Sequence, residues 1–348
     1  MQRPLRQLVW LALLAAALGT AQAQAVPHYR IVQQLALPGD EGWDYLTFEQ
    51  GGHRLFVAHG SRVLVVDSDK LAVAGEIADT PGVHGIALAP DLGRGYVSAG
   101  RAGTVVVFDL KTLARRGEIR VTGDNPDAIL YDPATHRVFT FNGRGRNATA
   151  IDAQSDTVLG TIALDAKPEF AQSDGRGRVY VNFEDRSSLA LLDPRKLAIV
   201  AVWPISGCRE PSGLALDAAR ERLFPGCQNQ VMAEVDGRTG RVLGSVSIGA
   251  GVDATAFDPG TGLAYASCGD GTLTVARATR AGALEVVQSV PTQRGARTMA
   301  LDLRTHRVFL VTADLAPAPP ASAGHPQPRP QIRPGSFRLL VLDPDFPP

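Results

Sequence analysis

The sequence has little cysteine, no net charge and only one long apolar run. Its 348 residues include three cysteines, too few for a disulfide-dense scaffold or a four-thiolate zinc site. The 35 basic residues balance the 35 acidic ones, so the charge gives no support to nucleic-acid binding. At 45% hydrophobic residues, the chain is not an intrinsically disordered one. The apolar run lies at the N-terminus, which excludes a protein that crosses a membrane many times.

The N-terminal run has the form of an export signal. Arg3 and Arg6 precede an apolar core, Leu8 to Leu18, that is too short to span a bilayer. Ala21-Gln22-Ala23 and Ala23-Gln24-Ala25 both supply the pattern of small residues at which signals are cleaved. We therefore interpret residues 1–25 as a signal peptide, after whose removal no membrane span is left. This predicts a periplasmic or secreted protein.

One pattern recurs along the remaining chain. Each copy contains an apolar strand, a turn, a strand of the form Arg-Val-Tyr/Phe-Val, a loop, a strand of the form Val-Val-Asp and a fourth apolar strand. The second strands of the seven copies begin, 40 to 44 residues apart, at Arg54, Arg94, Arg137, Arg178, Arg222, Leu263 and Arg307. A period of this length with four short strands is typical of a β-propeller blade. We expect residues 26–348 to form a single all-β domain, a seven-bladed propeller with four antiparallel strands in each blade.

Aspartate ends the third strand of most copies. These residues are Asp67, Asp109, Asp152, Asp193, Asp236 and Asp343. We interpret them as turn formers, because an aspartate side chain can accept hydrogen bonds from backbone amides just after it. The sixth copy departs from the pattern and carries Arg277.

The two ends of the chain together supply the four strands of the last blade. The seventh copy has three strands and no room for a fourth before Pro348, whereas Tyr29–Leu37 is an apolar strand without a blade. Pairing it beside Phe337–Asp343 would close the last blade and hide two sheet edges. Residues 315–334 of this copy hold seven prolines, which forbid a ladder strand and predict a surface loop inserted in blade seven.

The repeats resemble the YVTN-repeat (YncE-like) β-propellers, a family of exported bacterial proteins. The resemblance rests on motifs such as Gly42-Trp43-Asp44-Tyr45, Asn125-Pro126-Asp127-Ala128-Ile129 and Arg178-Val179-Tyr180-Val181-Asn182. It implies a binding or scaffold propeller and no common reaction, cofactor or catalytic residue. One member is associated with single-stranded DNA, which the near-neutral charge of this chain does not favour. The Trp-Asp and Gly-His signatures of WD40 repeats are missing at the matching places.

Seven residues occupy equivalent places just before the innermost strands and should surround one end of the central channel. They are Asp44, His84, Asp127, Glu169, Ser212, Asp253 and Arg297. Trp43 and His59 flank the same opening in the first copy, and they complete the predicted ligand-binding residues. Three interpretations remain open. The polar groups cap turns and hydrate the channel, or they bind a divalent cation or polar ligand, or two carboxylates act as catalytic acid and base.

No motif in the chain demands an enzyme. It has no Gly-x-Ser-x-Gly elbow, no phosphate-binding loop and no His-Glu-x-x-His or Cys-x-x-Cys sequence. We therefore predict a non-enzymatic binding or scaffold propeller, a monomer, which presents a site for a protein, peptide or small molecule at the polar mouth of its channel. The alternative is a metal-assisted hydrolase or a lactonase-type propeller that uses the acidic mouth.

The cysteines allow one short disulfide. Cys208 lies in the loop that leads into blade five, and Cys227 follows the second strand of that blade. Cys268 holds in blade six the place that Cys227 holds in blade five, and equivalent places in neighbouring blades are too far apart for a bond. Export to an oxidising compartment therefore predicts a Cys208–Cys227 bond and a free Cys268.

Overall fold

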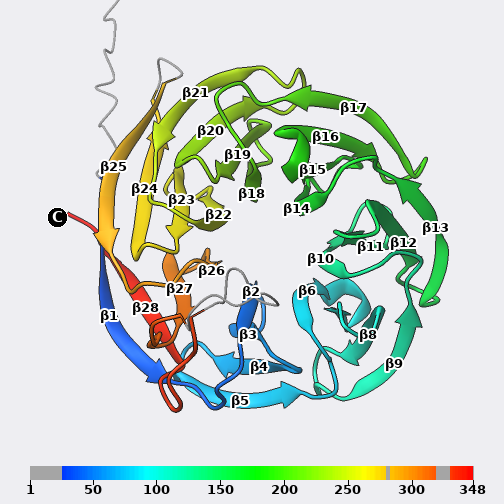
Figure 1. Ribbon diagram of the computed structural model, residues 1–348, viewed down its shortest axis with the longest axis horizontal. Coiled ribbons are helices and arrows are strands. Elements are labelled where there is room, and N and C mark those ends of the chain that lie inside the picture. Colours follow the sequence, from blue (N-terminus) through cyan, green and yellow to red (C-terminus); the bar gives the residue numbers. More distant parts are fainter. Residues whose placement is uncertain (1–25, 280–282, 319–329, 348) are drawn as a thin grey trace, which may run out of the picture.

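Seven four-stranded sheets stand around a central axis like the blades of a propeller (Figure 1). The structure is a computed structural model that describes residues 26–279, 283–318 and 330–347. Within these ranges the only helical segments are two 3₁₀ turns, η1 (Pro90–Leu92) and η2 (Glu184–Arg186). The predicted class of fold is thus confirmed: an all-β propeller with seven blades of four antiparallel strands.

The strands run from the axis outward in each blade, and the chain fills the blades in order. Blade one comprises β2 (Trp43–Glu49), β3 (Arg54–His59), β4 (Arg62–Asp67) and β5 (Ala72–Ile77). Blade two comprises β6 (Val83–Ala89), β7 (Arg94–Ala99), β8 (Thr104–Asp109) and β9 (Arg115–Arg120). Blade three comprises β10 (Pro126–Asp132), β11 (Arg137–Asn142), β12 (Asn147–Asp152) and β13 (Thr157–Ala163). Blade four comprises β14 (Pro168–Ser173), β15 (Val179–Phe183), β16 (Ser188–Asp193) and β17 (Ala198–Pro204). Blade five comprises β18 (Pro211–Asp217), β19 (Arg222–Cys227), β20 (Val231–Asp236) and β21 (Val242–Ser247). Blade six comprises β22 (Val252–Asp258), β23 (Leu263–Cys268), β24 (Thr272–Ala278) and β25 (Leu284–Pro291).

Blade seven is built from both ends of the chain. Its inner strands are β26 (Met299–Asp302), β27 (Arg307–Thr312) and β28 (Arg338–Asp345), and its outermost strand is β1 (His28–Ala36). The pairing runs from His28 opposite Asp345 to Ala36 opposite Arg338. The predicted closure by the N-terminal strand is therefore present, and it covers the edge that β28 would otherwise expose.

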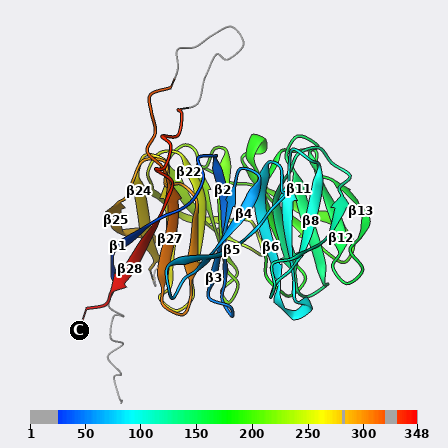
Figure 2. The ribbon, with the colours of Figure 1, turned by 90° about the horizontal axis from the view of Figure 1, so that it is seen from below.

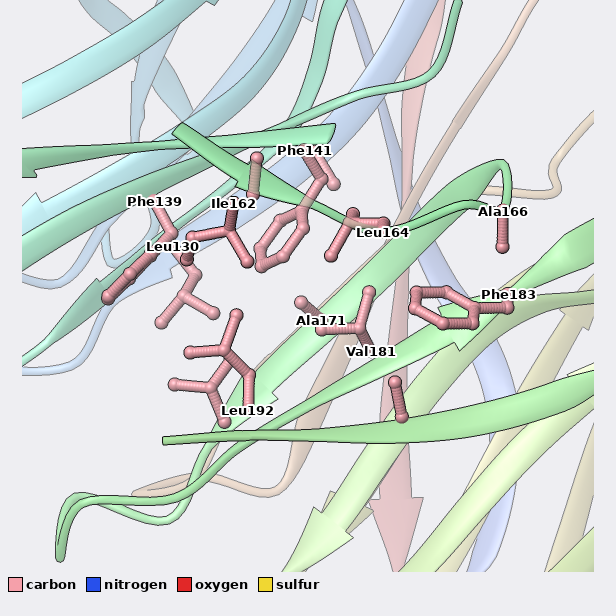
Figure 3. Packing of buried hydrophobic residues seen from close by; sticks show 14 of the residues in the cluster. Leu130, Phe139, Phe141, Ile162, Leu164, Ala166, Ala171, Val181, Phe183 and Leu192 are labelled. Atoms are coloured by element: carbon pink, nitrogen blue, oxygen red, sulfur yellow. The ribbon is translucent and has the colours of Figure 1, made fainter. Parts of the chain in front are cut away.

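The core consists of layers between neighbouring blades. The second and third strands of each blade are almost wholly buried because their two faces both contact another blade. Figure 3 shows the layer between blades three and four, where Phe139 and Phe141 of β11 meet Val181 and Phe183 of β15. The apolar runs of these strands therefore follow from burial on both sides, as the sequence pattern predicts.

The aspartates that end the third strands form turns, as predicted. Asp109 Oδ1 accepts hydrogen bonds from the backbone N–H groups of Lys111 (3.0 Å) and Thr112 (2.9 Å). The same pair of bonds recurs at Asp67, Asp152, Asp193 and Asp236. In blade seven Asp343 instead binds Arg307, because β28 and β1 are the two ends of the chain and no turn joins them.

In blades one to four, the arginine or tyrosine of the second strand joins the blade to the next one. Arg94 donates to the carbonyl of Ala153 (3.0 Å) and to Asp156 Oδ2 (2.8 Å), both in the turn after the third strand of blade three. Tyr96 OH donates to the same carbonyl at 3.0 Å. In other blades, bonds of this kind run from Arg54 to Leu110, from Arg137 to Pro194 and Arg195, and from Tyr180 to Gly237. We call these contacts the inter-blade hydrogen bonds.

The second strand of blade six begins with Leu263 and not with the arginine found in the other six blades, and the structure supplies a reason. An arginine at Leu263 would need the carbonyls of a turn between the third and fourth strands of blade seven, and these two strands are not joined by a turn. Tyr265 still joins its blade to the next one, but through a side chain: its hydroxyl lies 2.8 Å from Tyr29 OH in β1. Tyr29 OH in turn donates to the carbonyl of His306 at 3.0 Å. One buried tyrosine pair thus fastens the N-terminal strand into the ring.

The propeller has two different faces. The turns that lead into the innermost strands lie on one face, together with the described base of the predicted proline-rich loop (Figure 2). There Gly335 N donates to Asp40 Oδ1 at 2.6 Å, and Asp314 pairs with Arg338 at 2.6 Å. The C-terminal end of β28 and the start of β1 lie on the opposite face. We call the first of these the mouth face.

A disulfide crosses blade five at the mouth face. It joins Cys208 to Cys227, whose Cα atoms are 5.5 Å apart, and this is the pair that the loop positions predict. Cys268, the third cysteine of the described chain, is buried and forms no disulfide.

No helix in the described part of the chain is long and apolar enough to cross a membrane. The predicted signal peptide, residues 1–25, lies outside the described residues, as do residues 319–329 of the predicted proline-rich loop.

Deleting residues 26–36 should destabilise the whole ring. The deletion removes the ladder between β1 and β28, in which each bond contributes roughly 0.5–1.5 kcal/mol, and it exposes the edge of β28. We expect aggregation or a melting temperature lower by more than about 10 °C, measured by differential scanning fluorimetry and size-exclusion chromatography.

A single substitution tests the contribution of the tyrosine pair separately from that of the ladder between β1 and β28. Tyr29→Phe keeps the strand but leaves Tyr265 without its partner, which should cost about 1–3 kcal/mol. Tyr131→Phe, which removes a more exposed hydroxyl bonded to Asp91, is the control with a smaller expected effect. Unchanged melting of both the deletion and Tyr29→Phe would contradict closure by this strand.

Candidate functional site

A β-bulge lies at six of the seven equivalent residues, those of blades one to six. In blade one, Trp43 pairs with His59 and Leu46 with Val57, so one extra residue is inserted between these two pairs. The register shifts in the same way at the start of the innermost strand in blades two to six. A bulge re-aims consecutive side chains, so the residue at the predicted position and the one after it can both face the channel. We call the seven predicted residues the ring.

Three members of the ring lie together on blades one to three. His84 Nδ1 is 2.7 Å from Asp44 Oδ2 and 3.6 Å from Asp127 Oδ1. One ligand atom from each of the three residues lies within 4.8 Å of the others, which is close enough for a single metal ion. These side chains are partly buried, at 26%, 27% and 20% exposure for His84, Asp44 and Asp127 respectively.

The other members form two further groups. Arg297 Nε pairs with Asp253 Oδ2 at 2.7 Å, and Ser212 Oγ donates to Asp253 Oδ1 at 3.2 Å. Glu169 is 3.6 Å from the ammonium group of Lys167, which also pairs with Glu184. Lys167 and Glu184 were not predicted, because they lie outside the repeated position. A lysine two residues before Glu169 is the signal that could have indicated the first of them.

Burial and mutual repulsion raise the pKa values of Asp44, Asp127 and Glu169. Burial is the main cause for Asp127, and with the negative charge of Asp44 it raises the pKa of Asp127 to about 6 against the opposing effect of His84. Burial, with the charges of Asp127 and Glu184, raises the pKa of Glu169 to about 9. The pKa of Asp44 is raised by burial too. For His84, burial acts downward, but the hydrogen bond to Asp44 and the charge of Asp127 leave its pKa raised. Glu169 therefore keeps its proton at neutral pH and would release it to a cation.

The structure does not bring Trp43 and His59 to the ring. Trp43 stacks on Phe337 of blade seven, with ring centroids 5.6 Å apart. His59 is fully buried, stacks on the same Phe337 at 4.3 Å, and has Nε2 3.0 Å from Glu41 Oε2. Burial lowers the pKa of His59. In the structure these two residues hold blade seven against blade one, because both rings stack on Phe337.

An aromatic pair crosses the channel one residue below the ring. Tyr45 of β2 and Phe170 of β14 meet with ring centroids 5.1 Å apart, although their blades are not neighbours. The same position in the other blades carries Gly85, Ala128, Gly213, Ala254 and Thr298. At Gly213 an added Cβ would lie 2.5 Å from the backbone nitrogen of Thr255, so innermost strands approach too closely there for a side chain. Two large residues among five small ones were a signal in the sequence that the prediction missed.

The aromatic pair separates the mouth from a larger space. A cavity of about 1190 Å³ extends from Phe170 to the opposite face and is lined by residues of all seven blades. None of the ring residues is among those that line it. The channel therefore has two ends of different chemistry, an acidic mouth and an apolar chamber.

Comparisons with known proteins identify the fold. No family model matches the chain, and no curated protein does. Among solved structures 1843 chains match, so the architecture is a common one. Three examples are the structure of U3-55K (TM-score 0.73, 9% identity, 90% of this chain and 98% of that one), the RRP9 WD40 repeats (0.74, 10%, 92% and 99%) and a chain of the mitotic checkpoint complex (0.73, 13%, 99% and 100%). At these identities the likeness shows a seven-bladed propeller with WD40-repeat neighbours.

Replacing Glu169 by glutamine should stabilise the protein at alkaline pH. The pKa of Glu169 is about 9 in the folded chain against 4.5 as its ordinary value, so the folded state binds the extra proton between these two pH values. Wild-type stability therefore falls as the pH rises from about 4.5 to 9, whereas the glutamine side chain of the variant has no proton to lose. We expect no difference in melting temperature at pH 4 and a gain of roughly 2 °C or more, about 1 kcal/mol, at pH 9.

Glu210→Gln is the control, since Glu210 is an exposed carboxylate on the same face. It should show no such pH-dependent gain in a series of thermal scans. A Glu169→Gln variant that is less stable than wild type at pH 9 would contradict the burial of an acidic proton at this position.

Proposed function

We propose that the protein is an exported, non-catalytic interaction propeller of the YVTN-repeat (YncE-like) kind, which binds a cationic side chain of a partner protein or peptide at its acidic mouth. Export to the periplasm is supported by the signal-like residues 1–25, and the family by the repeat motifs. A role in protein interaction is supported by the propeller neighbours, one of which is a chain of the mitotic checkpoint complex.

The arrangement of the ring carries this proposal. Four carboxylates, those of Asp44, Asp127, Glu169 and Asp253, converge on one opening. Among the described residues, Arg297 pairs with Asp253, Lys167 lies 3.6 Å from Glu169, and the single imidazole of His84 lies between Asp44 and Asp127. Burial first, and then repulsion between the carboxylates, raises the pKa values of Asp127 and Glu169, and an incoming ammonium or guanidinium group would compensate that repulsion. Tyr45 and Phe170 lie beneath, and aromatic faces attract cations.

Peptide binding tests the proposal. Fluorescent nonapeptides with a central lysine, arginine, glutamine or glutamate are titrated with the mature protein, and anisotropy is measured. We expect the lysine or arginine peptide to bind at least about tenfold more tightly than the glutamine peptide. The affinity should increase from pH 5 to pH 9, because a cation prefers the ionised carboxylates and these lose their protons as the pH rises.

Matched variants locate the site. Asp127→Asn should weaken binding of the cationic peptide by about tenfold or more, a loss typical of one charge in a partly desolvated pair, whereas Glu210→Gln should not. Equal binding of the glutamate and lysine peptides, or binding that is unaffected by Asp127→Asn, would overturn the proposed function.

A second candidate is supported by the cluster of Asp44, His84 and Asp127. Its nitrogen and oxygen donors suit a divalent cation, which a metal-assisted hydrolase or lactonase-type propeller would use. Elemental analysis of native protein, with thermal scans in Ca²⁺, Mn²⁺ and Zn²⁺, separates the two candidates. A stoichiometric metal and a rise in melting temperature that Asp127→Asn abolishes would favour the enzyme.

A further inference from the structure

The chamber on the face opposite the mouth has apolar walls. Its lining includes Leu46, Ile86, Met299 and Leu301, which are 4–8% exposed, and the larger side chain of Phe257. Leu303 lies at the rim and is 39% exposed, so the apolar surface continues to the opening. The volume of about 1190 Å³ is somewhat larger than the roughly 300–1,000 Å³ usual for small-molecule pockets.

The polar side chains of the chamber wall are occupied by the protein itself. Thr47 donates to the carbonyl of Ile86 at 2.7 Å, and Gln172 donates to that of Leu214 at 2.9 Å. Gln50 both donates to Leu301 and accepts from Leu303. Thr255 donates to Phe224 at 2.9 Å. These bonds are made between neighbouring blades, so the wall offers an occupant mainly apolar surface.

Within the part of the chain that the structure describes, the rim carries one ammonium group that is not in an ion pair, whereas its carboxylates Glu49 and Asp174 pair with Arg54 and Arg178. The lining continues from the axis between blades one and two as far as Lys111, which is exposed and has no ion-pair partner among the described residues. Beside it, Arg54 pairs with Glu49 at 2.6 Å and donates to the carbonyl of Leu110, so the carboxylate in this part of the rim is already matched. An anion reaching this point would find an unpaired ammonium group.

We propose that the chamber is a binding site for an amphipathic monoanion, a molecule with an aliphatic body and a single carboxylate. The body lies along the axis against the walls below Phe170, where it removes apolar surface from water. The carboxylate lies between blades one and two and pairs with Lys111. This site is separate from the acidic mouth, which would repel the same ligand.

A chain-length series tests the site. Octanoate, decanoate and dodecanoate are titrated into the mature protein by isothermal calorimetry, below their micelle concentrations. We expect one site per chain and an affinity that increases by about tenfold with each two carbons, the gain for burying two methylene groups. Dodecylammonium should bind at least about tenfold more weakly than dodecanoate, because its cation meets Lys111 and Arg54.

Variants of the rim and the wall keep the test specific. Lys111→Glu should weaken dodecanoate binding by about tenfold, and Lys111→Arg should change it less than about threefold. Leu216→Glu places a charge in the wall, and Leu303→Glu does so at the exposed rim, where folding is not at risk. Both should reduce dodecanoate binding, with melting temperature as the check on folding.

The outcomes divide clearly. Saturable 1:1 binding that Leu303→Glu and Lys111→Glu weaken and that Asp127→Asn at the mouth leaves unchanged supports the chamber. Binding without saturation, equal binding of dodecylammonium, or loss on Asp127→Asn rather than on Leu303→Glu overturns it. None of these results depends on whether a cationic peptide binds the mouth.

Discussion

The circle of seven blades depends on the inter-blade hydrogen bonds, which begin in one blade and end in the next. A sheet of four strands has an apolar face on each side and no stability alone, so each blade needs a neighbour at a fixed distance and angle. Arg94 and Tyr96 supply this by reaching backbone carbonyls in the turn of blade three. The turn keeps its shape because an aspartate binds its amides. In blades one to three, the repeated arginine and the aspartate-held turn of the next blade are thus two halves of one contact. Arg222 and Arg307 pair instead with Asp236 and Asp343 of their own blades.

The same logic explains the exception in blade six. Where the contact partner is absent, the arginine is absent too, and a tyrosine pair performs its role. The leucine at position 263 therefore follows from the way blade seven is built. From the sequence, it marks the neighbouring blade as the one that is assembled from both ends of the chain.

The channel shows how a symmetric fold acquires an asymmetric site. The seven innermost strands begin alike, but large side chains in blades one and four meet across the axis, while small residues elsewhere allow this. A passage that would connect two faces becomes two compartments, and each can evolve its own chemistry. One is rich in carboxylates and the other in aliphatic carbon.

The repeat made the fold predictable, and the limits of the prediction have physical causes. Period, strand pattern and missing fourth strand were enough for seven blades and their closure, because each depends on order along the chain. Equivalent positions were also enough to gather Asp44, His84 and Asp127, since symmetry places them on one circle. The burial of His59 could not be predicted, because it depends on Phe337, which is almost 280 residues away in the chain. The chamber and the pairing of Tyr45 with Phe170 depend on contacts between blades that are not neighbours in sequence.

The seam in blade seven has a consequence for folding kinetics. β1 and β28 join residues more than 300 positions apart, whereas each of the other blades forms from a continuous segment of the chain. Closing a loop of this length has a high entropic cost and gains no contact until both strands are in place. The six continuous blades can therefore form first, with the seam as the last and slowest step. By the same reasoning, unfolding begins where β1 separates from β28, so the rate of that opening sets the lifetime of the closed ring.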